Sequence, residues 1–233
     1  MKILATSDMH GNLDGINLDG IDVAFFAGDI APLRGLSYWD VYDQLEWMNT
    51  EFYSFCLEWP KAKIVFAPGN HDFFPLAKEK CRGKLGFKGL DLSLNLAQNA
   101  TMLLDNSTDI NGLKVYGTPW VPIINHRWAF EAYPDLLKRK FSAIPHGLDV
   151  LLVHSPPRLG LVDVSLEYGP ESDKFGSHEL VEEIAAKEPK ICFCGHIHSG
   201  SHDMAKLCST EVWNVSRVNE SYEIAYDPLI VEL

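Results

Sequence analysis

The sequence predicts a layered α/β fold, because short apolar runs alternate with segments of helical periodicity. Five runs rich in Val, Ile and Phe end in polar or Gly-containing clusters, and their length and composition are typical of strands buried on both faces. These runs are residues 3–6, 23–27, 64–67, 150–153 and 191–194. Between them, residues 38–58, 128–141 and 178–187 have apolar side chains at helical spacing, although Pro134 interrupts the second. This alternation indicates sheets covered by helices.

Two further segments favour short strands rather than helices. Residues 103–116 contain apolar patches around turns, and Asn111-Gly112 is a strong signal for a hairpin. Residues 211–233 are strand-like in patches. The chain has 233 residues, enough for one large domain, and neither a repeat nor a low-complexity segment divides it. We therefore expect a single domain over residues 1–233.

The formal net charge of −12 restricts the classes of partner. An acidic chain is repelled by nucleic-acid backbones, so tight sequence-independent binding to duplex DNA or RNA is disfavoured. A pair of bound cations would reverse the sign of the charge locally, so a small anionic substrate is compatible with this composition. The sequence leaves the oligomeric state open.

Cysteine usage and the length of the apolar runs bear on the cellular compartment. Five cysteines, an odd number without regular spacing, do not form the pattern of a disulfide framework. Cys192 and Cys194 alternate within an apolar run, which favours buried core thiols over metal ligation or redox chemistry. Asp8 stands where a signal peptide needs its apolar centre, and no run is long enough to span a membrane. We expect a cytoplasmic protein with no membrane partner.

A polar cluster follows each of the five strand-like runs. The side chains concerned are Asp8 and His10 after the first run, Asp29 after the second, Asn70 and His71 after the third, His154 after the fourth, and His196 and His198 after the fifth. In an open α/β sheet, ligands gather beyond the carboxyl ends of the strands. Each fragment alone has an ordinary explanation as a turn or a core histidine. Their joint occurrence, each at a strand end, favours one shared site.

The residue types suit a pair of divalent ions. Imidazole and carboxylate ligands favour zinc, iron or manganese over calcium, and manganese is the ion we favour. No cysteine belongs to the set, which argues against a structural zinc site. Two ions about 3.5–4 Å apart hold a phosphoryl oxygen and activate a hydroxide. Because a carboxylate can span two cations, Asp29 is the natural bridge.

Taken in order, the clusters resemble the motifs of the calcineurin-like metallophosphoesterase superfamily. That pattern consists of Asp-x-His, Gly-Asp, Gly-Asn-His-Asp/Glu, a later His, and Gly-His-x-His. Here it matches residues 8–10, 28–29, 69–72, 154 and 195–198. The resemblance implies a four-layer αββα sandwich with two central β-sheets, with the metal site at the C-terminal edge of the strands.

The resemblance also implies a division of roles. The seven metal ligands would be Asp8, His10 and His198 for one ion, Asn70, His154 and His196 for the other, and Asp29 for both. His71 would bind no metal and would protonate the leaving oxygen or steady the phosphate, as a catalytic general acid. Asp72 either orients the His71 imidazole as a further catalytic residue or serves only in the turn.

Further segments are similar to those of the small brain-type metallophosphoesterase-domain proteins and their microbial relatives. These segments are residues 115–120, 128–130, 154–157 with Ser155 in place of Gly, 213–216 and 228–231. Those relatives are associated with phosphodiester hydrolysis, including that of cyclic nucleotides. By contrast, protein Ser/Thr phosphatases of the superfamily carry a second Asp and an Arg soon after Gly-Asp. Residues 30–35 lack that Asp and place the Arg differently, as Arg34.

From these relationships we expect a metal-dependent phosphoesterase with two divalent ions as its cofactors. The expected reaction is hydrolysis of a small phosphodiester, such as a cyclic nucleotide, by metal-bound hydroxide. A phosphomonoester is the alternative substrate class. A non-catalytic scaffold of the same fold is a further alternative, but such proteins typically lose ligands or the catalytic histidine, and every one of these positions is filled here.

Overall fold

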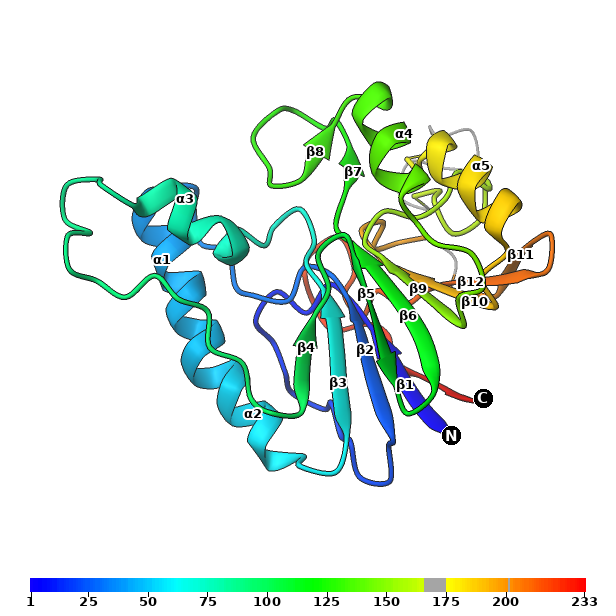
Figure 1. Ribbon diagram of the computed structural model, residues 1–233, viewed down its shortest axis with the longest axis horizontal. Coiled ribbons are helices and arrows are strands. Elements are labelled where there is room, and N and C mark those ends of the chain that lie inside the picture. Colours follow the sequence, from blue (N-terminus) through cyan, green and yellow to red (C-terminus); the bar gives the residue numbers. More distant parts are fainter. Residues whose placement is uncertain (166–174, 201) are drawn as a thin grey trace.

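Two β-sheets pack face to face in the computed structural model, which describes residues 1–165, 175–200 and 202–233. Helices lie on the outer side of each sheet (Figure 1). Three apolar clusters separate the layers: one beneath each group of helices and one between the two sheets. The expected four-layer αββα sandwich is therefore confirmed.

The first sheet contains the first three apolar runs of the sequence. Its strand order is β13-β1-β2-β3-β4. The strands are β1 (Lys2–Thr6), β2 (Val23–Ala27), β3 (Lys63–Ala67), β4 (Ala100–Met102) and β13 (Leu229–Glu232). The first four are parallel, whereas β13 is antiparallel to β1 at the edge. Because β1, β2 and β3 run in the same direction, their carboxyl ends meet at one edge of the sheet.

The second sheet contains the other two runs and has the order β11-β12-β10-β9-β6-β5. Its strands are β5 (Asn106–Ile110), β6 (Leu113–Thr118), β9 (Val150–Val153), β10 (Ile191–Cys194), β11 (Ala205–Leu207) and β12 (Thr210–Asn214). The four inner strands are parallel, and β5 and β11 are antiparallel edges. The predicted hairpin joins β5 to β6, and Asn111 and Gly112 both have positive φ, as a type I′ turn requires.

The helices beside the first sheet follow the predicted segment 38–58. α1 (Tyr38–Trp47) continues through a π-helical turn (Met48–Phe52) into α2 (Tyr53–Glu58), which ends before Pro60. Ser37 caps α1, because its side chain accepts from Asp40 N while the Asp40 side chain accepts from Ser37 N. A 3₁₀ turn (Phe74–Leu76) and α3 (Ala77–Cys81) pack near the start of α1.

Among the residues that the structure describes, two helices cover the second sheet, and the prediction for one of them was half wrong. α5 (His178–Lys187) occupies the predicted residues, after a Ser177 cap. α4 spans only Pro134–Ser142, because proline lacks an N–H and is tolerated in the first turn of a helix but not in its interior. The residues before it form a small two-stranded sheet of β7 (Val121–Pro122) and β8 (Glu131–Ala132) instead.

The layer between the sheets fixes their relative position. Phe25 of β2 and Phe193 of β10 are fully buried there, with ring centroids 5.9 Å apart. Beyond the strand ends, His154 Nδ1 lies 2.8 Å from the Ala27 carbonyl oxygen, so the residue after β9 is tied to the last residue of β2. The carboxyl ends of β1, β2, β3, β9 and β10 therefore converge from two sheets on one region.

Candidate metal centre

The predicted site residues lie in the loops that follow five parallel strands. Asp8 and His10 follow β1, Asp29 follows β2, Asn70 and His71 follow β3, His154 follows β9, and His196 and His198 follow β10. The structure brings them together at the edge where both sheets end. Most of these side chains are buried, while His10, His71 and His196 are partly exposed.

Left-handed backbone directs several of the candidate ligands inward. Asp8, His10, Asp29 and His196 have φ between 46° and 70° although none is glycine. Such conformations cost about 1–3 kcal/mol each and are typical of functional sites. Gly69 also packs closely against these loops, because a Cβ atom at this position would collide with Asp29 Oδ1. The motif glycines thus allow loops from different strands to approach closely.

Side-chain nitrogen and oxygen atoms converge at two adjacent points. At the first, His10 Nε2 lies 3.5 Å from His198 Nε2, which is 3.4 Å from Asp8 Oδ1. At the second, His154 Nε2 lies 3.2 Å from Asp29 Oδ2 and 3.0 Å from Asn70 Oδ1.

Asp29 stands between these two points. The same oxygen that approaches His154 also lies 3.9 Å from His10 Nε2. Within the part of the chain that the structure describes, potential ligand atoms that lie within 4.8 Å of one another form three groups. The groups are Asp8, His10 and His198; Asp8, Asp29 and His154; and His10, Asp29 and His71. His196 belongs to none of these groups among the described residues, but its ring centroid is 5.1 Å from that of His154.

The protonation states fit cation binding. Burial alone would raise the pKa of Asp8 and Asp29, but His198 near the former and His154 near the latter outweigh it and hold both carboxylates ionised. Burial lowers the pKa of His10 to about 4 and that of His196 to about 3, so both imidazoles are neutral at pH 7. Ionised carboxylates and neutral imidazoles are the forms that ligate divalent metals.

His198 and His154 are the exceptions among the imidazoles, since Asp8 outweighs burial and raises the pKa of His198. For His154 the partner is Asp29. Burial opposes the protonation of His154, but the charge of Asp29 outweighs that effect and raises the pKa of His154 to about 9. A protonated His154 pairs with Asp29, and a cation at the same point would take the place of that proton. The donor set thus fits divalent cations.

Asp72 holds two of the site loops together. Its carboxylate accepts hydrogen bonds from the backbone N–H groups of Ile30, Ala31 and Gly69, at 2.8–3.1 Å. Burial raises its pKa to about 7. These contacts support the turn role of Asp72, whereas the orientation of the His71 imidazole by this carboxylate stays a prediction.

Gln44 is a site residue that sequence reasoning missed. It lies buried on α1, where its amide nitrogen donates to His71 O at 2.8 Å. Its amide oxygen accepts from Phe73 N at 2.7 Å and from Phe74 N at 3.2 Å. The only sequence signal is a polar residue between Val41 and Leu45 on the apolar face of a helix. Gln44 fixes the backbone on which His71 stands.

His71 lies between a metal-ligand candidate and an aromatic wall. Its ring stacks on Trp128 with centroids 4.3 Å apart and an interplanar angle of 10°. On another side it meets the His10 ring at 5.0 Å, edge to face. Trp128, one of the tryptophans in the predicted segments, therefore supports the site wall.

A turn at residues 219–223 covers the first point of convergence and was also missed by sequence reasoning. The Asn219 carbonyl oxygen lies 3.2 Å from His198 Nδ1. The Tyr222 ring packs edge to face on His10 and His198, with centroids 4.8 Å and 5.2 Å away. No local motif marks this turn, because only the folded chain brings it to His10 at the other end of the sequence.

A cavity of about 600 Å³ opens beside these side chains. His10, His71, Trp128 and Tyr222 form part of its wall, and Arg34 and Leu36 come from the loop before α1. The cavity therefore joins candidate metal ligands to aromatic and apolar surfaces. It offers space for an organic group attached to a phosphate held at the ligands.

A layered α/β fold with carboxylate and imidazole side chains gathered at its strand ends is typical of metal-dependent phosphoester hydrolases. The family model of calcineurin-like phosphoesterases matches residues 1–200, and the chain belongs to that family. It is 29% identical over 252 residues to human metallophosphoesterase domain-containing protein 1, covering 100% of this chain and 71% of that protein. It is 30% identical over 178 residues to a UPF0046 protein of Caenorhabditis elegans, covering 74% of this chain and 62% of that one.

Solved structures agree with the fold. The Thermus thermophilus protein TT1561 matches with a TM-score of 0.57 and 16% identity, over 91% of this chain and 88% of that chain. Phosphopantetheinyl hydrolase from Mycobacterium tuberculosis matches with a TM-score of 0.51 and 15% identity, over 92% and 88%. At this identity the likeness concerns the fold alone.

Proposed function

We propose that the protein hydrolyses a small phosphodiester with two divalent cations, manganese being favoured. Asp29 would contact both cations, with Asp8, His10 and His198 completing one site and Asn70, His154 and His196 the other. When bound, the pair would hold the phosphate and supply the nucleophile from water. The convergence of these side chains around Asp29 is the observation that carries the proposal.

His71 is the proposed general acid. Its ring is partly exposed, faces the cavity and is held by Trp128, while Gln44 fixes its backbone. A proton donor there can reach the oxygen that leaves as the ester bond breaks. Because His71 also groups with His10 and Asp29, a role as a metal ligand is the competing assignment.

The cavity supports a diester over a monoester. A diester carries a second organic group, and the wall formed by Trp128, Tyr222 and Leu36 offers aromatic and apolar contact for it. A nucleobase would suit such a wall, since aromatic side chains stack on any base. Cyclic nucleotides are therefore candidate substrates. We also propose a cytoplasmic location, which the five free cysteines support.

Two chromogenic esters test the proposal directly. We expect manganese-dependent release of p-nitrophenol from bis-p-nitrophenyl phosphate, at a higher rate than from p-nitrophenyl phosphate. Higher turnover of the second ester would make the protein a phosphomonoesterase. Release from neither ester, with metal analysis showing two bound ions, would instead support a non-catalytic member of the family. A screen of cyclic nucleotides then tests the narrower substrate class.

A further inference from the structure

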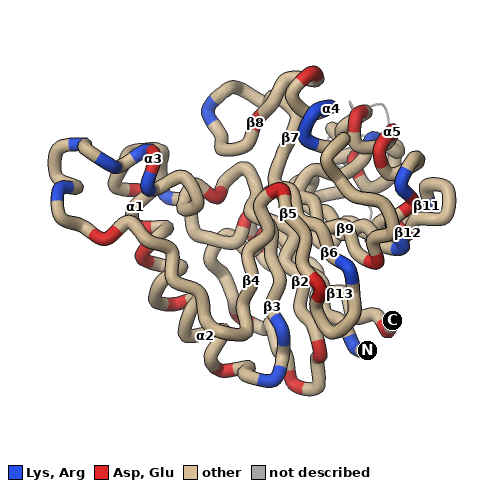
Figure 2. The backbone as a smooth tube through the Cα atoms, in the orientation of Figure 1, with Lys and Arg blue, Asp and Glu red and all other residues tan. Residues whose placement is uncertain are grey.

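A basic segment projects from this acidic protein beside the start of α1. It comprises α3 and the loop after it, which stands away from both sheets in Figure 1. Its cations are Lys78, Lys80, Arg82, Lys84 and Lys88. With Glu79 as the single acid, residues 78–88 carry a formal charge of +4, whereas the whole chain carries −12. Figure 2 shows this concentration of Lys and Arg along the projecting loop.

The loop encloses a hollow lined by unpaired cations. The hollow has a volume of about 640 Å³, and Lys78, Arg82, Lys84 and Lys88 all line it. Among the described residues, none of these four forms an ion pair with a carboxylate. Asp91 is the one acid in the lining, and its carboxylate accepts a hydrogen bond from Ser93 N at 3.0 Å. Such a surface attracts an anionic ligand.

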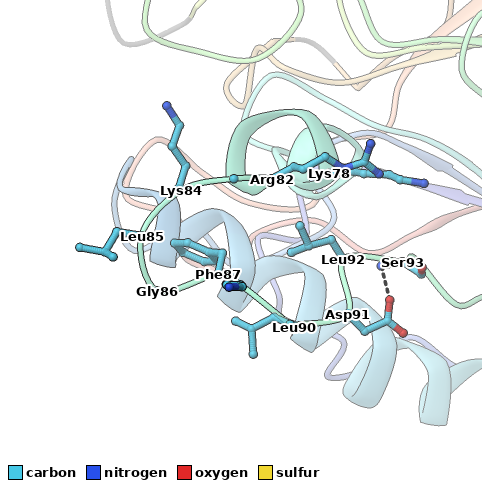
Figure 3. A pocket seen from close by; sticks show the side chains of 13 residues that line it. Lys78, Arg82, Lys84, Leu85, Gly86, Phe87, Leu90, Asp91, Leu92 and Ser93 are labelled. Carbon is cyan, nitrogen blue, oxygen red and sulfur yellow. Dashed lines mark hydrogen bonds between the residues drawn. The ribbon is translucent and has the colours of Figure 1, made fainter.

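Apolar side chains share this surface with the cations. Leu85 is 101% exposed, and its side chain extends outward from the loop in Figure 3. Trp39, which is 51% exposed, packs on Phe87 with ring centroids 4.4 Å apart. A single exposed leucine is ordinary. Leucine and tryptophan among several lysines form the composition that binds the interface of an anionic bilayer.

We propose that this basic loop binds the headgroups of anionic phospholipids, with Leu85 entering the interfacial layer of the membrane. The acidic remainder of the molecule would be repelled by the same surface, so the contact is confined to the projection. A contact of this kind needs no spanning helix, and the described part of the chain has no helix long and apolar enough to be one. The expectation of no membrane partner follows from the missing apolar spans, and a peripheral contact through the basic loop departs from that expectation.

The loop also adjoins the entrance of the candidate site. Lys84 Nζ lies 4.9 Å from the centroid of the Tyr38 ring, and Leu36, two residues earlier, lines the cavity beside His71. A docked membrane would therefore lie near that cavity. The docking itself does not depend on the proposed hydrolysis, because none of the loop cations is a candidate metal ligand.

Vesicle sedimentation tests the docking. The full chain is mixed with phosphatidylcholine vesicles, with or without phosphatidylserine, at low and high salt. We expect sedimentation with the anionic vesicles only, weakening as salt rises. The double substitution Lys84→Gln with Lys88→Gln should weaken vesicle binding at least about tenfold, since each lysine near an anionic surface contributes substantially. Leu85→Ser should also weaken it without changing the charge.

A matched double variant serves as the control. Lys61→Gln with Lys63→Gln removes two exposed cations between α2 and the start of β3, and should sediment like the unchanged protein. Circular dichroism melting of all variants verifies that each is folded. Equal losses in the two double variants, equal binding to neutral vesicles, or binding to soluble polyglutamate but not to vesicles would each overturn the proposal.

Discussion

At the scale of single residues, substitution of His71 distinguishes a general acid from a metal ligand. His71→Ala should lower kcat by about 10²–10⁴, because the leaving oxygen loses its proton donor. Both ions should stay bound, because the other candidate ligands are untouched. Metal analysis beside chromogenic-ester kinetics measures both quantities, and His146→Ala, an exposed histidine outside the site, is the control. Loss of one ion from His71→Ala would show that the imidazole is a ligand.

Tyr222 should act on substrate binding rather than on the chemical step. Its ring packs on His10 and His198 and lines the cavity, while the residue is 54% exposed. Tyr222→Ala should raise KM for an aryl diester by up to about tenfold, since it removes an aromatic wall. Tyr222→Phe should keep KM within about twofold, because the ring remains. Equal losses in both variants would assign the effect to the hydroxyl instead.

The same scale shows which site residues a sequence can reveal. Asp8, Asp29 and His154 were predictable because each follows a recognisable apolar strand, and parallel strands bring their ends to one edge. Gln44 and Tyr222 were not, because neither lies at a strand end. Gln44 acts from the middle of a helix, and Tyr222 reaches the site from a turn near the other end of the chain. Their roles depend on tertiary contacts that leave no local pattern.

At the scale of elements, α1 is the support for the loop that carries His71. Gln44→Leu would remove the acceptor for Phe73 N and Phe74 N and the donor to His71 O. The free energy of unfolding should fall by about 3 kcal/mol, because buried backbone groups lose their hydrogen-bond partners. Urea denaturation measures this, with the exposed Gln98→Leu as the control. Unchanged stability of Gln44→Leu would contradict the supporting role of the helix.

Elements differ in how well the sequence predicts them. Buried strands and α5 were predictable from their apolar periods and, for the helix, from its Ser177 cap. The segment before α4 was not, because Trp128 and Phe130 each have an apolar or aromatic residue three or four positions later, as on one face of a helix. In the structure these aromatic residues serve the site wall and the core cluster of the first sheet. Tertiary contacts, rather than the helical spacing of the apolar residues, therefore decide the structure of this segment.

At the scale of the whole molecule, the candidate metal centre joins the two sheets. Asp8, Asp29 and Asn70 extend from the first sheet, whereas His154, His196 and His198 extend from the second. Cations at this point would bind the native arrangement and not the unfolded chain. Manganese at a hundred times its dissociation constant should therefore add about 2.7 kcal/mol to the free energy of unfolding. The melting temperature should rise with manganese and fall after chelation.

Stabilisation by manganese should depend on Asp29, because this residue is the proposed bridge between the two cations. Asp29→Asn should weaken both sites together, because one carboxylate oxygen approaches His10 and His154. Its melting temperature should respond little to manganese, whereas the exposed Asp43→Asn should respond like the unchanged protein. Calorimetric scans with manganese and with chelator, combined with metal analysis, measure both effects. Two tightly held ions in Asp29→Asn would remove the bridge, and an equal manganese response in both variants would place the stabilising cations elsewhere on the molecule.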